Sequence, residues 1–170
     1  FIQEDSIARV YPNGNLFSHV IGQIDNDNNG ISGLEKTFDY ELRTSRDPLK
    51  LTLDTDLQYL IREELIKSEN IFQNIGSAAI LMDVNNGNIL SMVSLPDFDL
   101  NKRKKISDIK FINRATRGVY EFGSVFKTFT IAAGIHYDVI KPKTEFKGLK
   151  KRISCAGNPI SEYDDKISSD

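Results

Sequence analysis

The most apolar stretch of the chain covers residues 124–135, where hydrophobic side chains occupy nearly every side of a possible helix. A helix that is hydrophobic all round is typical of a protein core. Gly123 precedes this stretch, and Ser124 is of a residue type preferred at helix starts. The pattern therefore predicts a buried helix from Ser124 to Ile135.

A second apolar pattern predicts a hairpin in the middle of the chain. Residues 78–83 and 88–93 read as strands, and the Asn-Asn-Gly sequence at 85–87 between them is a strong signature for a tight turn. Helices packed on such an antiparallel sheet would form an α+β domain.

The segment before the hairpin predicts a strand followed by a helix. Residues 49–53 alternate between apolar and polar positions like a strand, and Thr55 with Gln58 matches a capping box. The helix that follows is expected to bury one apolar face, made of Leu57, Leu60, Ile61 and Leu65.

The two ends of the chain are more polar than its middle. Residues 1–48 are rich in Asn, Asp and Gly, with short β-like pieces such as 17–22, and they predict a small loop-rich module. A second domain is expected over residues 49–170, since the pattern changes at Asp47-Pro48. Residues 151–170 are polar and weakly patterned, so we expect them to be irregular or disordered.

Composition narrows the function classes. A hydrophobic content of 39%, a charged content of 27% and a net charge of −2 give no concentrated basic surface, so no nucleic-acid partner is expected. The one basic run, at 102–105, is typical of a solvated loop.

Cys155 is the only cysteine, which excludes an internal disulfide. No window reaches the roughly 18 consecutive apolar residues of a membrane span. Because the chain begins with Phe1 and not Met, we expect a processed or excised piece whose membrane anchor lies upstream.

Several polar residues are candidates for a metal or catalytic site. Residues 25–30 match the first half of a calcium-binding EF-hand loop, but Lys36 stands at the twelfth position, where a glutamate is required, so a plain hydrophilic turn is expected. His19 and His136 have no partner at ligand spacing, and both are interpreted as structural. Glu121 is interpreted as a loop residue. No metal and no cofactor are therefore expected.

Ser124 and Lys127 allow two interpretations. Ser124 could simply cap a helix whose first turn exposes Lys127. Alternatively, both side chains share a helical face, and a lysine near the start of a buried helix is costly unless it gives up its proton or finds partners. Such a lysine can act as a general base on the serine hydroxyl, and the serine N–H, free at the helix start, can help to hold an oxyanion.

The region around these residues resembles a known family. Residues 120–127 are similar to the S-x-x-K region of penicillin-binding transpeptidases of class B, especially the cell-division type. The resemblance is collinear over about 140 residues. It extends to the segments 9–12, 19–22, 30–35, 51–58, 82–99 and 113–116. Residues 1–48 resemble part of the non-catalytic pedestal of that class, and residues 49–170 the amino-terminal part of its transpeptidase domain.

The resemblance implies an activity and its residues. Ser124 would be the nucleophile acylated by D-Ala-D-Ala stem peptides or by β-lactams, and Lys127 the proposed base. The full enzyme would cross-link peptidoglycan at the septum, outside the cytoplasmic membrane, among divisome membrane proteins. Alternatives are a penicillin sensor, a β-lactamase, or a non-catalytic fragment that docks division partners.

The sequence departs from the family in two respects. Phe122 stands where many members have proline, and an apolar residue there should leave the turn intact. The later S-x-N and K-T-G motifs have no match after Ser124, since the one Ser-x-Asn, at 68–70, lies upstream. The chain is therefore expected to be an amino-terminal fragment that is inactive alone and leaves its apolar helix exposed.

Overall fold

A computed structural model describes residues 9–102, 108–148, 150 and 152–161. The chain divides into two compact units, Phe1–Tyr120 and Glu121–Asp170. We call them the amino-terminal unit and the carboxyl-terminal unit. Each combines helices with antiparallel strands, so the predicted α+β class is confirmed.

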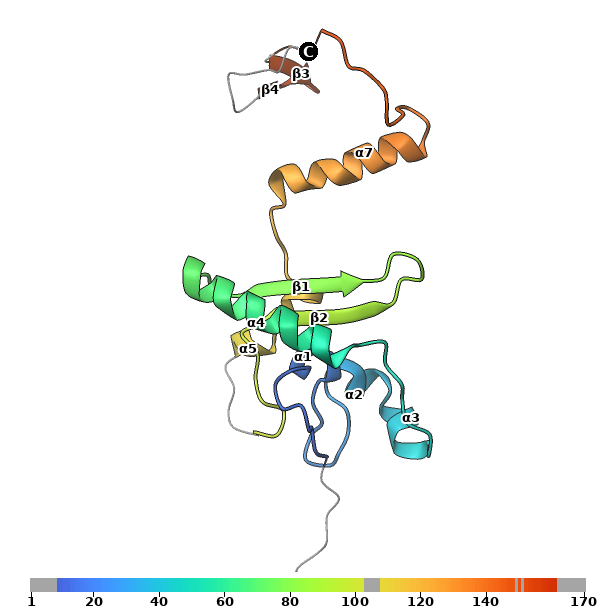
Figure 1. Ribbon diagram of the computed structural model, residues 1–170, viewed down its shortest axis with the longest axis vertical. Coiled ribbons are helices and arrows are strands. Elements are labelled where there is room, and N and C mark those ends of the chain that lie inside the picture. Colours follow the sequence, from blue (N-terminus) through green and yellow to red (C-terminus); the bar gives the residue numbers. More distant parts are fainter. Residues whose placement is uncertain (1–8, 103–107, 149, 151, 162–170) are drawn as a thin grey trace, which may run out of the picture. The chain divides into compact units, whose positions relative to one another are not determined.

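The hairpin is the centre of the amino-terminal unit (Figure 1). Strands β1 (Ser77–Met82) and β2 (Ile89–Leu95) pair antiparallel, from Ser77 opposite Leu95 to Met82 opposite Ile89, as the sequence predicts. The carboxylate of Asp83 organises the turn because it accepts hydrogen bonds from the backbone N–H and the side-chain amide of Asn85. These bonds hold the pKa of Asp83 below its ordinary value.

Helix α4 (Thr55–Phe72) packs across the hairpin. Its N-cap is Asp54, whose carboxylate accepts the backbone N–H of Leu57 at 2.9 Å, so the predicted capping box at Thr55 is wrong. Aspartate is as good a cap as threonine, and it leaves Gln58 free for another role.

The predicted strand at residues 49–53 does not form. The segment runs beside the start of β2, where the Thr52 hydroxyl donates to the carbonyl of Ile89 and the N–H of Asp54 donates to that of Leu90. A side-chain hydroxyl replaces a backbone donor in this pairing, so the segment is extended without a regular ladder.

The buried face of α4 also differs from the prediction. Leu60 is 56% exposed, whereas Gln58 is 1% exposed. The helix turns a partly polar face to the hairpin, because β2 and the amino-terminal segment offer hydrogen-bonding groups there. Hydrophobic periodicity alone could not find this face.

The amino-terminal segment contains three short helices in place of the predicted β-like pieces. They are α1 (Ser18–Ile21), α2 (Gly33–Thr37) and α3 (Asp39–Thr44). At Gly22, with a φ of 81°, a Cβ atom would lie 2.0 Å from the carbonyl oxygen of Ser32, so the close approach of this loop requires glycine. A domain boundary at residue 48 stays a prediction.

The core of the amino-terminal unit is small. Its buried hydrophobic residues are Phe17, Val93, Leu95, Phe98 and Leu100. Two further short helices, α5 (Asp108–Phe111) and α6 (Arg114–Arg117), follow β2. Of the basic run, Lys102 forms an ion pair with Asp99, and residues 103–105 lie outside the described residues.

The carboxyl-terminal unit contains a helix and a second hairpin. The 3-10 helix η1 (Gly123–Phe126) leads into α7 (Lys127–His136), and strands β3 (Arg152–Cys155) and β4 (Asn158–Ser161) pair antiparallel. The predicted irregular tail is therefore wrong over 152–161, and residues 162–170 lie outside the described residues. The turn has positive φ at both Ala156 and Gly157, an uncommon choice for alanine that weakens the hairpin signal in the sequence.

Candidate active site

The candidate nucleophile lies in a tight turn at the start of α7. Gly123 has a φ of 52°, a left-handed conformation that favours glycine, and the N–H of Val125 donates to the carbonyl of Phe122 at 3.1 Å. Ser124 is the second residue of η1, not the first residue of a long α-helix as the sequence predicted. Phe122 in place of proline is compatible with this turn, since its backbone adopts φ −71°.

The 3-10 turn aligns the serine and the lysine. The backbone N–H of Lys127 donates to the carbonyl of Ser124, and its φ and ψ of −59° and −27° are 3-10-like. Residues three apart eclipse each other in a 3-10 helix, whereas in an α-helix they are offset around the axis. Ser124 and Lys127 therefore share one face more closely than the predicted α-helix would allow.

The helix that carries these residues is exposed. Val125 is 66% exposed, Phe126 59% and Phe129 63%, and both Ser124 and Lys127 are exposed. The buried helix that the apolar pattern predicts is not found within the carboxyl-terminal unit, where η1 is the main described element that packs on α7. The burial of Lys127 in a completed enzyme stays a prediction. Within its own unit, α7 is uncovered, which agrees with the expectation that the chain by itself leaves this apolar helix exposed.

The side chains of Ser124 and Lys127 have no polar partner among the described residues. Within the described residues, neither the hydroxyl of Ser124 nor the amine of Lys127 forms a hydrogen bond or an ion pair. Glu121 lies in the loop before η1, as predicted. The backbone of the turn is formed, although its two candidate side chains have no polar partner among these residues.

The segment that leads toward the serine is anchored on β2 by Ser94. The buried Ser94 hydroxyl accepts the N–H of Arg114 at 2.9 Å and donates to the carbonyl of Ile112 at 3.2 Å. Asn113 caps α6 by accepting the N–H of Ala115. No sequence pattern pointed to Ser94, because a serine in a strand normally faces solvent.

Gln58 is a second residue that the sequence reasoning missed. Its amide NH₂ donates to the carbonyls of Leu16 and Met92, and its oxygen accepts from the Ser91 hydroxyl and the Met92 N–H, all between 2.8 and 2.9 Å. This one side chain joins the amino-terminal segment, α4 and β2. A glutamine among the apolar residues of a helix was the available signal.

An ion pair further along α4 also stabilises the contact between the amino-terminal segment, α4 and the hairpin. Arg62 lies 2.7 Å from Asp97, and Asn15 donates to the same carboxylate. The carboxylate of Asp97 raises the pKa of Arg62. Together with Gln58, this pair fixes the amino-terminal segment on the helix and the hairpin.

The remaining candidates have structural roles. Asp25 accepts hydrogen bonds from the N–H groups of Asp27 and Asn29, which makes residues 25–30 a hydrophilic turn, as predicted. His19 bonds the carbonyl of Lys110 at 2.7 Å and contacts the ring of Phe98. Burial lowers its pKa below 6.5. His136 stacks edge-on against Tyr137.

The described part of the chain contains neither a metal-binding cluster nor a membrane-spanning helix. No group of three or more His, Cys, Asp or Glu side chains is arranged to hold a metal ion. No helix there combines the length and the apolar character that crossing a membrane requires.

Comparison with known families identifies the family of the chain. Residues 77–169, more than half of the chain, match the family model of the penicillin-binding protein transpeptidase domain. The chain belongs to this family. The resemblance to class B proteins of the septal type, drawn from the sequence, is confirmed by the relatives that it matches.

Three similar proteins give the extent of the match. A probable peptidoglycan D,D-transpeptidase FtsI from Caulobacter vibrioides is 35% identical over 147 residues, which cover 84% of this chain and 25% of that protein. The FtsI of Escherichia coli K12 is 27% identical and is covered to 30%. Penicillin-binding protein 3 of Mycobacterium tuberculosis has a similar structure, with a TM-score of 0.75 at 26% identity over 92% of this chain and 37% of that one. The chain spans about a quarter to a third of the curated relatives it matches.

Proposed function

We propose that this chain is the nucleophile-bearing part of a peptidoglycan D,D-transpeptidase that works in septal cell-wall synthesis. The observation that carries the proposal is the single 3-10 turn that begins at a left-handed Gly123 and aligns Ser124 with Lys127. Membership of the transpeptidase family supports this interpretation over simple helix capping.

In the first step, the Ser124 hydroxyl attacks the carbonyl of the penultimate D-Ala of a stem peptide. Lys127, as an unprotonated amine, takes the hydroxyl proton, and the proton then passes to the departing amine of the terminal D-Ala. The peptide bond breaks, free D-Ala leaves, and an ester forms on Ser124. A backbone N–H at the start of the turn stabilises the oxyanion of the tetrahedral intermediate.

In the second step, an amine of a neighbouring stem peptide attacks this ester. A new peptide bond forms, the Ser124 oxygen leaves, and the proton of the amine returns to it through Lys127. A β-lactam would acylate the same oxygen when its ring opens. Structures of the related M. tuberculosis protein are described as complexes with aztreonam and ampicillin, which supports β-lactams as ligands here.

The exposed face of α7 agrees with a site completed by further chain. We propose that strands bearing the S-x-N and K-T-G motifs cover this face in the whole enzyme, which would bury Lys127 and favour its unprotonated form. The whole enzyme would be anchored in the cytoplasmic membrane, act on its outer side and contact divisome membrane proteins.

Fluorescent penicillin separates this proposal from its alternatives. A form of the protein that also carries S-x-N and K-T-G should be labelled, and Ser124→Ala should abolish the label. A non-catalytic docking fragment would not be labelled in any form. A β-lactamase would release hydrolysed penicillin within minutes, and a penicillin sensor would retain the label but fail to release D-Ala from a stem peptide.

A further inference from the structure

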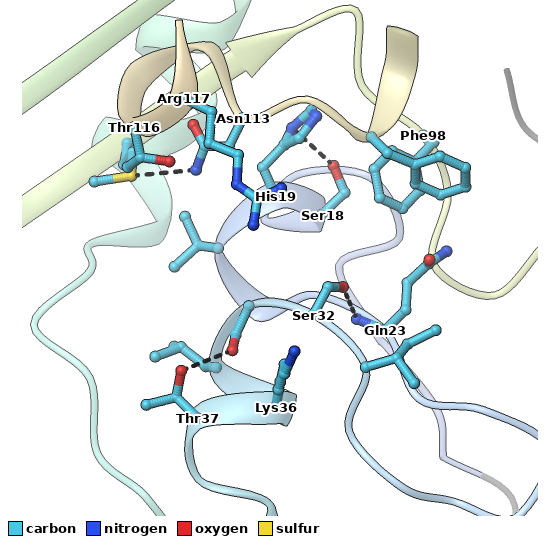
Figure 2. A pocket seen from close by; sticks show the side chains of 16 residues that line it. Ser18, His19, Gln23, Ser32, Lys36, Thr37, Phe98, Asn113, Thr116 and Arg117 are labelled. Atoms are coloured by element: carbon cyan, nitrogen blue, oxygen red, sulfur yellow. Dashed lines mark hydrogen bonds between the residues drawn. The ribbon is translucent and has the colours of Figure 1, made fainter. Parts of the chain in front are cut away.

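A cavity of about 720 Å³ opens in the amino-terminal unit, and neither Ser124 nor Lys127 is among the residues that line it. It lies between α2 and α6, with α1 along its side (Figure 2). Its apolar wall includes Leu34, Phe98 and Phe111. The volume lies within the roughly 300–1,000 Å³ typical of sites for small organic ligands.

The charged residues that line the cavity are both cations. Lys36 comes from α2 and Arg117 from the end of α6, and no Asp or Glu is among the residues that line the space. Neither cation forms an ion pair within the described part of the chain. Figure 2 shows Arg117 entering from the α6 side and Lys36 from the α2 side. His19 also lines the cavity, but burial lowers its pKa, so it adds no full charge at neutral pH.

The polar groups that line the cavity include unused donors. The hydroxyl of Ser32 already accepts the N–H of Gln23, and that of Thr37 donates to the carbonyl of Gly33. The side-chain amide of Gln23 and the hydroxyl of Thr116 have no hydrogen bond to any described residue. Two unpaired cations, free neutral donors and an aromatic wall in one hollow match the chemistry of an anion with an apolar body.

We propose that this cavity binds a small organic anion, with its carboxylate or phosphate between Lys36 and Arg117 and its apolar part against Phe98 and Phe111. The guanidinium of Arg117 can bind two oxygens at once, and the ammonium of Lys36 supplies a point charge from the opposite wall. The site is independent of the acyl-transfer chemistry proposed for Ser124.

Equilibrium dialysis of the full 170-residue chain with radiolabelled hexanoate and with phenyl phosphate tests the site, because dialysis does not depend on the assembly state. Saturable binding near one probe per chain is expected. Since a hydrogen bond to a charged group contributes about 1.5–3 kcal/mol, Lys36→Gln and Arg117→Gln should each weaken binding by about tenfold or more. Tighter binding of hexanoate identifies a carboxylate ligand, and tighter binding of phenyl phosphate a phosphorylated one.

Three controls keep the test specific. Lys50→Gln, which removes an exposed lysine that does not line the cavity, should change the dissociation constant by less than about twofold, because Lys50 would not contact the bound anion. Arg117→Lys should retain more binding than Arg117→Gln, and Ser124→Ala should bind like the parent. The proposal is overturned if neither probe saturates, if uncharged hexan-1-ol competes as well as hexanoate, or if Lys50→Gln weakens binding as much as Lys36→Gln.

Discussion

The amino-terminal and carboxyl-terminal units are stabilised in different ways. In the amino-terminal unit a buried glutamine, a partly buried ion pair and five buried hydrophobic residues tie helices to a hairpin. In the carboxyl-terminal unit no described residue is buried, and the apolar helix α7 is open. The residues proposed for catalysis lie in the second unit. Its reactive turn is thus shaped by local backbone geometry, while the packing that would complete the site is not formed within it.

The largest effect should be that the chain by itself has no catalytic activity. Loss of one oxyanion donor costs roughly 10²- to 10³-fold in rate, and correct positioning can contribute about 7–11 kcal/mol to the lowering of a barrier. Without the S-x-N and K-T-G motifs, no stable adduct with fluorescent penicillin is expected at concentrations that saturate an intact homologue. The exposed face of α7 should make the chain aggregate or require a partner. A soluble monomer labelled in full would place the complete active site within these 170 residues.

The next largest effect should be a loss of acylation rate without a loss of stability when Lys127 in the carboxyl-terminal unit is replaced. In a form that carries the later motifs, Lys127→Ala should slow acylation by about 10²- to 10⁴-fold, the contribution typical of a general base. The melting temperature should stay nearly unchanged or rise, because a buried amine is costly. Stopped-flow acylation and thermal unfolding measure the two quantities. If Lys127→Ala is acylated at the rate of the parent protein, Lys127 is an ordinary surface lysine without a role in acylation.

The opposite behaviour is expected of Gln58 in the amino-terminal unit. Gln58→Leu leaves the hydroxyl of Ser91 and the N–H of Met92 without their acceptor, so the free energy of unfolding should fall by about 3 kcal/mol. The matched variant Leu60→Gln, on the exposed side of the same helix, should change it by less than about 0.5 kcal/mol. Urea denaturation followed by circular dichroism measures both. Equal effects would show that Gln58 does not join these segments in solution.

The smallest effect is a pH dependence of the stability of the amino-terminal unit. Because burial holds the folded-state pKa of His19 below 6.5, the unfolded state binds the proton more readily. The stability that neutral His19 contributes is therefore complete above about pH 6.5 and is lost as the pH falls toward the folded-state value. The carboxyl groups of Asp25, Asp83 and Asp99, with lowered pKa values, act only below about pH 4.

Urea midpoints measured between pH 7.5 and 5 test this dependence. His19→Gln can still donate to the carbonyl of Lys110 but cannot titrate, so its midpoint should vary less with pH than that of the parent. If the urea midpoint of His19→Gln varies with pH as strongly as that of the parent, His19 is not the cause of the pH dependence.

Sequence reasoning succeeded where the signal is local and failed where tertiary contacts decide. The hairpin at 77–95 follows from its strands and turn residues, and the turn at 25–30 follows from its side chains. The buried face of α4 and the helix α1 were missed, because hydrogen bonds to distant segments select them. The cap at Asp54 was missed although its bond to Leu57 is local, because Thr55 offered a competing capping pattern. The S-x-x-K spacing was found, but its 3-10 geometry and the exposure of Lys127 depend on backbone and packing that a pattern of residue types does not encode.

Mass spectrometry of the acylated peptide tests the central claim most directly. A form that carries the S-x-N and K-T-G motifs would be treated with penicillin, digested and mapped, beside its Ser124→Ala variant. The account predicts one adduct, on the peptide that contains Ser124, and none in the variant. An adduct on another peptide, or undiminished labelling of Ser124→Ala, would contradict it.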